Sequence, residues 1–152
     1  MKTRLALLFA LCGLLAGTAH AMEIVVADAW TRASAPGQTV AGVYFSVQSD
    51  VDAALVGAET TAADVSELHF MSMEDGVMRM RAVPRVALPA GTKVRFKPGG
   101  YHVMLFDLQQ PLEPGDEITV FLVIEGGAGR TSRVKVPVHV RNLDGSKAQH
   151  HH

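Results

Sequence analysis

Turn-forming residues divide the chain beyond residue 21 into segments that are too short for long helices. Clusters of Gly, Pro, Asp and Ser recur about every 8–12 residues, and the segments between them alternate or are rich in Val, Ile, Thr and aromatic residues. None of these segments keeps a helical period of apolar residues over three turns. About nine short strands in this arrangement predict an all-β domain, either a β-sandwich or a Greek-key barrel.

The expected strands follow from the alternation of apolar and polar side chains. In chain order they are residues 23–29, 39–48, 53–59, 67–73, 77–83, 93–97, 101–108, 117–125 and 130–141. Residues 60–66 are small and polar, so we expect a loop there, and residues 84–92 contain the turn Pro89-Ala90-Gly91. Pro137 predicts that the last strand lies at an edge of the sheet, because proline has no N–H to donate to a neighbouring strand.

The first 21 residues are typical of a cleaved secretory signal peptide. Lys2 and Arg4 form its charged start, and residues 5–15 form an apolar core that is too short to span a membrane. Ala19-His20-Ala21 matches a small-x-small cleavage site, so we expect a periplasmic protein whose mature chain begins near Met22. An uncleaved membrane anchor is the alternative, and the lack of a second apolar segment argues against it.

The only cysteine, Cys12, lies within this leader. A lipoprotein signal needs a small residue before its cysteine, whereas Leu11 stands there, so we expect Cys12 to be removed with the signal. A mature chain without cysteine excludes disulfides, thiol nucleophiles, thiolate zinc sites and blue-copper centres. Loss of Lys2 and Arg4 changes the formal net charge from −1 to −3, which favours neither nucleic acid nor an anionic membrane as a partner.

Four side chains with metal-binding atoms stand at a distinctive spacing. Ten residues separate His69 from Met80, twenty-one separate Met80 from His102, and one separates His102 from Met104. Thioether sulfur is a soft, uncharged ligand that favours Cu(I), and imidazole also suits copper. Such a site contains no thiolate, so it can work where cysteines would be oxidised. We therefore predict that these four side chains hold one Cu(I) ion.

The hairpin that carries two of these residues is indicated by an Asp-Gly pair between alternating segments. If Asp75-Gly76 is a two-residue loop, Met80 lies opposite Met71 and one diagonal step from His69. If Glu74-Asp75 is the loop instead, Met80 lies directly opposite His69. A three-residue loop turns Met80 away unless a bulge restores it. Alternation places His102 and Met104 on one face of their own strand, but does not say where that strand lies.

Two other interpretations compete with a copper site. Methionine on a strand usually packs in the core, and we expect this of Met73 and Met78. A hydrolytic zinc site could use Glu67 or Asp107 beside the two histidines, but leaves Met80 and Met104 unexplained. Five of the six methionines beyond Met1 lie between residues 71 and 104, which favours ligands over a purely structural or adhesive β-sandwich.

At this point the sequence resembles the periplasmic copper chaperones called PCu(A)C. The four-residue spacing of His69, Met80, His102 and Met104 is the specific part of the resemblance. Weaker similarities extend over almost the whole mature chain: Asp28-Ala29-Trp30 with Arg32, Ala41-Gly42-Val43-Tyr44, and Gly76-Val77-Met78-Arg79-Met80. Phe70 departs from the family, where many members have a polar or acidic residue, and alternation turns position 70 away from the ligands.

The resemblance implies a cupredoxin-like Greek-key β-barrel with an exposed Cu(I) site formed by His69, Met80, His102 and Met104. It also implies a chaperone rather than an enzyme. Copper would be delivered toward the Cu(A) site of cytochrome c oxidase subunit II, alongside a Sco-type thioredoxin-like protein. General periplasmic copper storage or tolerance is the alternative role.

Residues 22–141 are expected to form a single monomeric β domain, followed by a flexible tail over residues 142–152. The tail ends in His150, His151 and His152, which can bind Cu(II). The alternative is that these histidines are a cloning remnant or have no function.

Overall fold

The computed structural model describes residues 21–147, and the expectations for the signal peptide and the terminal histidines lie outside the described residues. Ten strands form the sheet: β1 (Ile24–Arg32), β2 (Val40–Ser49), β3 (Ala53–Thr60), β4 (Ala63–Glu74), β5 (Val77–Ala82), β6 (Val86–Leu88), β7 (Val94–Phe96), β8 (Tyr101–Leu108), β9 (Glu117–Glu125) and β10 (Thr131–Arg141). Between residues 21 and 147 the helical structure is one short 3-10 turn, Gly127–Gly129, and no helix there is long and apolar enough to cross a membrane. The predicted all-β class is confirmed.

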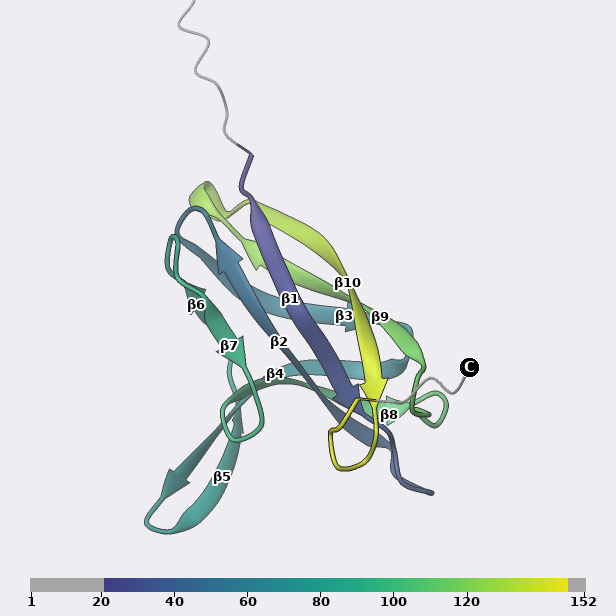
Figure 1. Ribbon diagram of the computed structural model, residues 1–152. Coiled ribbons are helices and arrows are strands. Elements are labelled where there is room, and N and C mark those ends of the chain that lie inside the picture. Colours follow the sequence, from purple (N-terminus) through teal and green to yellow (C-terminus); the bar gives the residue numbers. More distant parts are fainter. Residues whose placement is uncertain (1–20, 148–152) are drawn as a thin grey trace, which may run out of the picture.

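The strands lie in the order β5-β4-β8-β2-β1-β10-β9-β3-β6, and β7 pairs with β2 beside this path (Figure 1). Neighbours are antiparallel except β1 and β10, which run parallel. Buried side chains of β2 and β8 join those of β9 and β10 in one hydrophobic cluster, so the sheet folds over onto itself around a common core. Such closure buries one face of every long strand, which the two-residue alternation of the sequence requires.

β2 illustrates how alternation builds this core. Its residues alternate strictly between buried and half-buried, with Val43, Phe45 and Val47 facing inward as predicted. Phe45 stacks on Phe96 of β7 with ring centroids 4.4 Å apart. Burying a side chain of this size contributes about 1.5–3 kcal/mol, so this strand anchors the layer in which the candidate site lies.

Two predicted loops contain strand residues. Ala63 begins β4, within the segment predicted as a loop, and pairs with Leu108 of β8. Small polar residues have low strand propensity, but an available neighbouring strand overrides that preference. Val86–Leu88 forms β6, which pairs with β3, and both Val86 and Leu88 are buried in the core.

The edge position predicted from Pro137 is wrong. β10 lies between β1 and β9. β1 pairs with β10 only from Trp30 to Arg32, opposite His139 to Arg141. At Pro137 the pairing with β1 has not yet begun, so no neighbour on that side needs an N–H from the proline.

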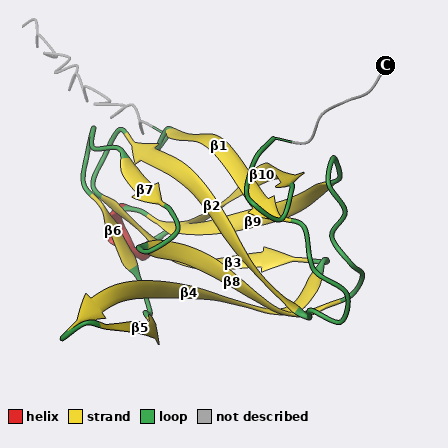
Figure 2. Ribbon diagram, turned by 60° about the horizontal axis from the view of Figure 1, so that its bottom comes forward, coloured by secondary structure: helices red, strands yellow, loops and turns green. Residues whose placement is uncertain are grey.

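The β4–β5 hairpin ends the sheet, and its outer part projects from the body of the molecule (Figure 1 and Figure 2). The first part of β4 is paired with β8, from Ala63 to Phe70. The hairpin turn has φ of 52° at Asp75 and 77° at Gly76, the positive values that a two-residue type I′ turn needs at both positions. Met71 therefore lies opposite Met80, and His69 lies opposite Ala82. Of the three hairpin loops considered, the structure has the two-residue loop Asp75-Gly76.

The chain beyond β10 begins with a hydrogen-bonded loop. The Asn142 amide donates to the Ser146 carbonyl at 3.0 Å, and the Gly145 amide donates to the Asn142 carbonyl at 2.8 Å. Gly145 lies against Trp30, with φ of 84°. The tail predicted over residues 142–152 therefore begins with a hydrogen-bonded turn, and residues 148–152 lie outside the described part.

Candidate metal centre

The two histidines lie side by side because β8 pairs with β4 in the same sheet. His69 is the direct partner of His102, and Glu67 is the direct partner of Met104. The two imidazole centroids are 5.7 Å apart. Directly paired residues of an antiparallel ladder share a face, so His102 and Met104 lie on the same face as His69 and Met80.

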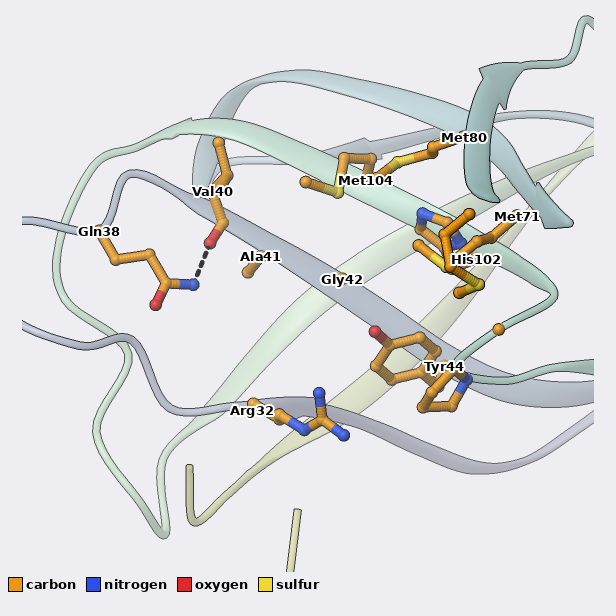
Figure 3. Close-up of a pocket in the computed structure, with 13 residues that line it drawn as sticks. Arg32, Gln38, Val40, Ala41, Gly42, Tyr44, Met71, Met80, His102 and Met104 are labelled. Carbon is orange, nitrogen blue, oxygen red and sulfur yellow. Dashed lines mark hydrogen bonds between the residues drawn. The ribbon is translucent and has the colours of Figure 1, made fainter. Parts of the chain in front are cut away.

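A pocket of about 410 Å³ opens on this face (Figure 3). Three of the four predicted ligands line it, namely Met80, His102 and Met104. The other lining residues are Arg32, Gln38, Val40, Ala41, Gly42, Tyr44, Met71, Met78, Pro98 and Gly99. His69 is not in the lining and lies next to His102 instead. The structure thus gathers three predicted ligands around one cavity and places the fourth beside it.

His102 is oriented by the backbone. Its side chain is 3% exposed, and its Nδ1–H donates to the Gly100 carbonyl at 3.1 Å. Because a carbonyl can only accept, the hydrogen resides on Nδ1, and the lone pair of the neutral ring is left on Nε2. Burial lowers the pKa of His102 from its usual 6.5, the Gly100 hydrogen bond opposes this, and the neighbouring His69 lowers it further. The neutral ring is the form that binds metals.

His69 presents the opposite nitrogen. Its Nε2–H donates to the Glu67 carboxylate at 2.8 Å, and its ring packs 5.8 Å from the Phe106 ring. Its Nδ1 is buried without any hydrogen-bond partner, the one side-chain atom of this kind between residues 21 and 147. Buried nitrogens are nearly always paired, so the lone pair of this nitrogen is available to a ligand from outside the chain, and imidazole nitrogen is a common metal ligand.

The spacing of the two rings fits a shared ion. Imidazole nitrogen binds metals at about 2 Å, so an ion held between two rings separates their centroids by about 6 Å. The observed separation is 5.7 Å. The donors are imidazole nitrogen and thioether sulfur, which together select a soft ion such as Cu(I).

The hydrolytic zinc alternative has no matching cluster in the structure. Glu67 does contact His69, as alternation allows. However, the described residues contain no group of three or more His, Cys, Asp or Glu side chains that could hold a metal ion. The Glu67 carboxylate instead accepts a hydrogen bond from His69, which is a common way to orient a metal-binding imidazole.

The methionines of the hairpin are not core residues. Met73 is 64% exposed and Met78 is 52% exposed, so the packing role predicted for them is wrong. The hairpin extends past the body of the molecule (Figure 1), and its strand β5 is exposed along its whole length. Met80 is 46% exposed, which leaves its thioether accessible from solvent.

Sequence reasoning missed several residues of the pocket. Met71 was not among them, because the two-residue loop already predicted its position opposite Met80, and the structure places it in the pocket lining. Tyr44 also lines the pocket, and Figure 3 shows its hydroxyl turned toward Gly42. A Cβ at Gly42 would lie 2.7 Å from that hydroxyl oxygen, so glycine is needed for this orientation. Burial raises the pKa of Tyr44, and the Arg32 charge partly opposes this. Arg32, Gly42 and Tyr44 all belong to segments that carried the family resemblance.

Comparisons with known proteins give the following matches. The family model described as "Putative lipoprotein LpqE-like" matches residues 24–138. A curated relative, "Putative lipoprotein Lxx21020" of Leifsonia xyli subsp. xyli, is 36% identical over 116 residues, which cover 76% of this chain and 69% of the relative.

Solved structures with the same architecture include copper-binding domains. The apo PCuAC domain from PmoF1 matches with a TM-score of 0.63 and 26% identity, over 78% of this chain and 93% of that domain. The copper-bound PCuAC domain from PmoF2 matches with a TM-score of 0.62 and 26% identity, over 78% of this chain and 92% of that domain. The Cu(I) form of DR1885 from Deinococcus radiodurans matches with a TM-score of 0.57 and 28% identity, over 77% of this chain and 76% of that protein. The predicted cupredoxin-like fold is confirmed by these structures.

Proposed function

The chain belongs to the LpqE-like family, and from that premise and the geometry of its pocket we propose that it is an extracytoplasmic copper chaperone. It binds one Cu(I) ion through His69, Met80, His102 and Met104 and passes the ion to another protein. It performs no covalent chemistry on its cargo. The copper-bound PmoF2 domain and the Cu(I) form of DR1885 support the choice of metal and of oxidation state.

One observation carries the proposal. His69, whose buried Nδ1 has no partner, is the cross-strand neighbour of His102, whose Nδ1–H donates to Gly100. Each ring thus has one nitrogen fixed by the protein and one left for a ligand. The thioethers of Met80 and Met104 belong to the same face of the sheet as the two imidazoles, which supports their assignment to the same site.

The same geometry favours transfer over permanent storage of the ion. Met80 lies on the outermost strand and is half exposed, so an incoming ligand from a partner can reach its sulfur. His69 and His102 lie deeper in the sheet and are almost fully buried. Ligand exchange therefore begins at the exposed thioethers and ends at the imidazoles, while copper stays Cu(I) throughout.

A competition titration tests the binding site. Mature protein is titrated anaerobically with Cu(I) against a chromophoric Cu(I) chelator, in wild type and in the variants His69→Ala, His102→Ala and His139→Ala. Loss of either ligand should weaken binding at least about tenfold, or 1.4 kcal/mol. The exposed His139 is the matched control and should have no effect. Equal affinities in all four proteins contradict the proposed site.

The proposed recipient is the Cu(A) site of cytochrome c oxidase subunit II, with a Sco-type thioredoxin-like protein as co-partner. The support for this step is the resemblance to PCu(A)C chaperones. Deletion of the gene should lower oxidase activity in medium with little copper. A normal oxidase together with poor growth at high copper would instead assign the protein to copper storage or tolerance.

The proposal also includes secretion by a cleaved signal over residues 1–21, and Cu(II) binding at His150, His151 and His152. The LpqE-like family description supports an extracytoplasmic location. The terminal histidines are tested separately by removing them and repeating the titration with Cu(II). Unchanged Cu(II) binding after their removal argues against a second copper site in the tail.

A further inference from the structure

The outer half of the β4–β5 hairpin carries four thioethers on one face. Met71 is directly opposite Met80, and Met73 is directly opposite Met78. Residues two apart on a strand share a face, as do directly paired residues, so all four lie on the face that also carries His69. The row runs from the two histidines to the Asp75-Gly76 turn at the tip.

Packing does not account for these side chains. Met73 and Met78 are more than half exposed, and Met80 is nearly so. The opposite face of the hairpin carries Phe70 and Val77 together with an ion-pair cluster, in which the Glu74 carboxylate pairs with Arg81 at 2.7 Å and with Arg79 at 3.3 Å. Charges are thus confined to one face, and the other presents only uncharged sulfur ligands.

The dimensions of the ladder suit one metal ion. Paired Cβ atoms lie about 5 Å apart and successive rungs on one face about 6.8 Å apart, so the centre of the four Cβ positions is about 4 Å from each. A methionine sulfur is two bonds beyond Cβ and has three flexible torsions, and metal–sulfur bonds are about 2.3 Å long. Three or four of these sulfurs can therefore reach a common point.

We infer that Met71, Met73 and Met78 form a second Cu(I) position on the hairpin, farther toward its tip than the His69–His102 pair and adjoining the inner site at Met80. Met71 and Met78 also line the pocket of His102 and Met104, so the two positions are continuous. All ligands of this second position are neutral and soft, so it takes Cu(I) or Ag(I) and leaves Zn(II) and Cu(II) unbound. It has no imidazole and is exposed to water, so it holds the ion more weakly than the inner site does.

The position of Met80 connects the two sites. It is a proposed ligand of the inner ion and the cross-strand partner of Met71. Movement of an ion between the sites forms one copper–sulfur bond as another breaks, with no change in oxidation state. This use as a loading step rests on the proposed function, whereas the existence of the outer site rests on the strand register and on exposure alone.

The test follows each methionine separately. Mature protein with [13C]methyl-labelled methionine is titrated with Ag(I), a redox-inert substitute for Cu(I), and its methyl resonances are recorded. Early additions should shift Met80 and Met104, and later additions should shift Met71, Met73 and Met78. In Met73→Leu/Met78→Leu the later shift of Met71 should be lost and one fewer Ag(I) should bind per chain, while the early shifts remain.

Met22 is the control within the same spectra, because its sulfur lies near Gly126, away from the hairpin. Hairpin methyls that never move, or that move only together with Met22, overturn the outer site, since the second result means that any exposed thioether binds. If Met71, Met73 and Met78 shift while Met80 and Met104 do not, the outer site stands and the proposed inner site fails. If Met80 and Met104 shift while Met71, Met73 and Met78 do not, the proposed inner site stands and the outer site is rejected.

Discussion

His69 and His102 are direct partners across β4 and β8, with ring centroids 5.7 Å apart and with opposite nitrogens fixed by the protein. Glu67 accepts from Nε2–H of His69, and Gly100 accepts from Nδ1–H of His102. Two rings held in this way need little reorganisation to take a metal ion. Preorganisation of this kind raises affinity without adding ligands.

The Glu67 carboxylate should therefore matter for copper although it is not a ligand. Glu67→Gln replaces the carboxylate that orients the His69 ring by a neutral amide, and should weaken Cu(I) binding about 10–100-fold. Competition titration measures the effect, and circular dichroism should show an unchanged fold. Glu74→Gln is the control, because Glu74 lies on the charged face of the hairpin. Equal losses in the two variants would reject an orienting role for Glu67.

The stability of the metal-free protein should fall as the pH drops below about 6.5. Burial holds the pKa of His102 below this value in the folded state, so the unfolded chain binds the proton more readily. This favours unfolding at low pH by at most about 1.4 kcal/mol per pH unit. His102→Asn keeps an N–H near Gly100 but does not titrate. Urea unfolding between pH 5 and 7.5 should show a shallower decline for this variant, and parallel declines contradict the prediction.

The contact between Gly42 and Tyr44 predicts a coupled pair. A Cβ at position 42 would lie 2.7 Å from the Tyr44 hydroxyl oxygen, so Gly42→Ala should cost about 1–3 kcal/mol through crowding. Tyr44→Phe removes that oxygen, and the cost of Gly42→Ala should shrink in its presence. A double-mutant cycle by urea unfolding measures the coupling. If the changes in unfolding free energy for Gly42→Ala and Tyr44→Phe simply add, the Tyr44 hydroxyl does not crowd position 42, and the prediction is contradicted. Gly57→Ala, with ordinary contacts of 3.8 Å, is the control.

The N-terminus of the secreted protein distinguishes signal cleavage from lipidation. Cleavage after Ala21 predicts a mature chain that begins near Met22 and carries no lipid. The LpqE-like relatives are described as lipoproteins, so Cys12 is the residue to examine. Intact mass and N-terminal sequencing of the protein from its native host measure this directly. A chain that begins at a lipid-modified Cys12 contradicts the predicted signal.

Much of the site could be read from local sequence. The Asp75-Gly76 pair sets a two-residue turn, and this turn fixes the register that places Met80 opposite Met71. Alternation alone puts His102 and Met104 on one face. These inferences succeed because they depend on residues close together in the chain.

The rest depends on pairing between distant segments. Nothing in the alternation of residues 101–108 says that this strand lies beside β4, so the direct pairing of His69 with His102 had to come from the structure. The beginning of β4 at Ala63 depends on β8 in the same way. The prediction that Pro137 lies on an edge strand was wrong because proline requires only that its own position lack a partner that needs an N–H. An inner strand such as β10 can meet this requirement where its pairing with β1 has not yet begun. The exposure of Met73 and Met78 likewise follows from how far the hairpin extends past the body.

X-ray absorption of the Cu(I)-loaded mature protein, beside the variant Met80→Ala/Met104→Ala, tests the central claim most directly. The proposed site predicts sulfur scattering at about 2.3 Å together with imidazole nitrogen in the wild type. When Met73→Leu/Met78→Leu removes the outer site from both proteins and one Cu(I) is added per chain, the sulfur contribution should be lost or strongly reduced in the Met80→Ala/Met104→Ala protein. Coordination by nitrogen alone, or sulfur scattering that the variant leaves unchanged, would contradict a His69, Met80, His102 and Met104 site.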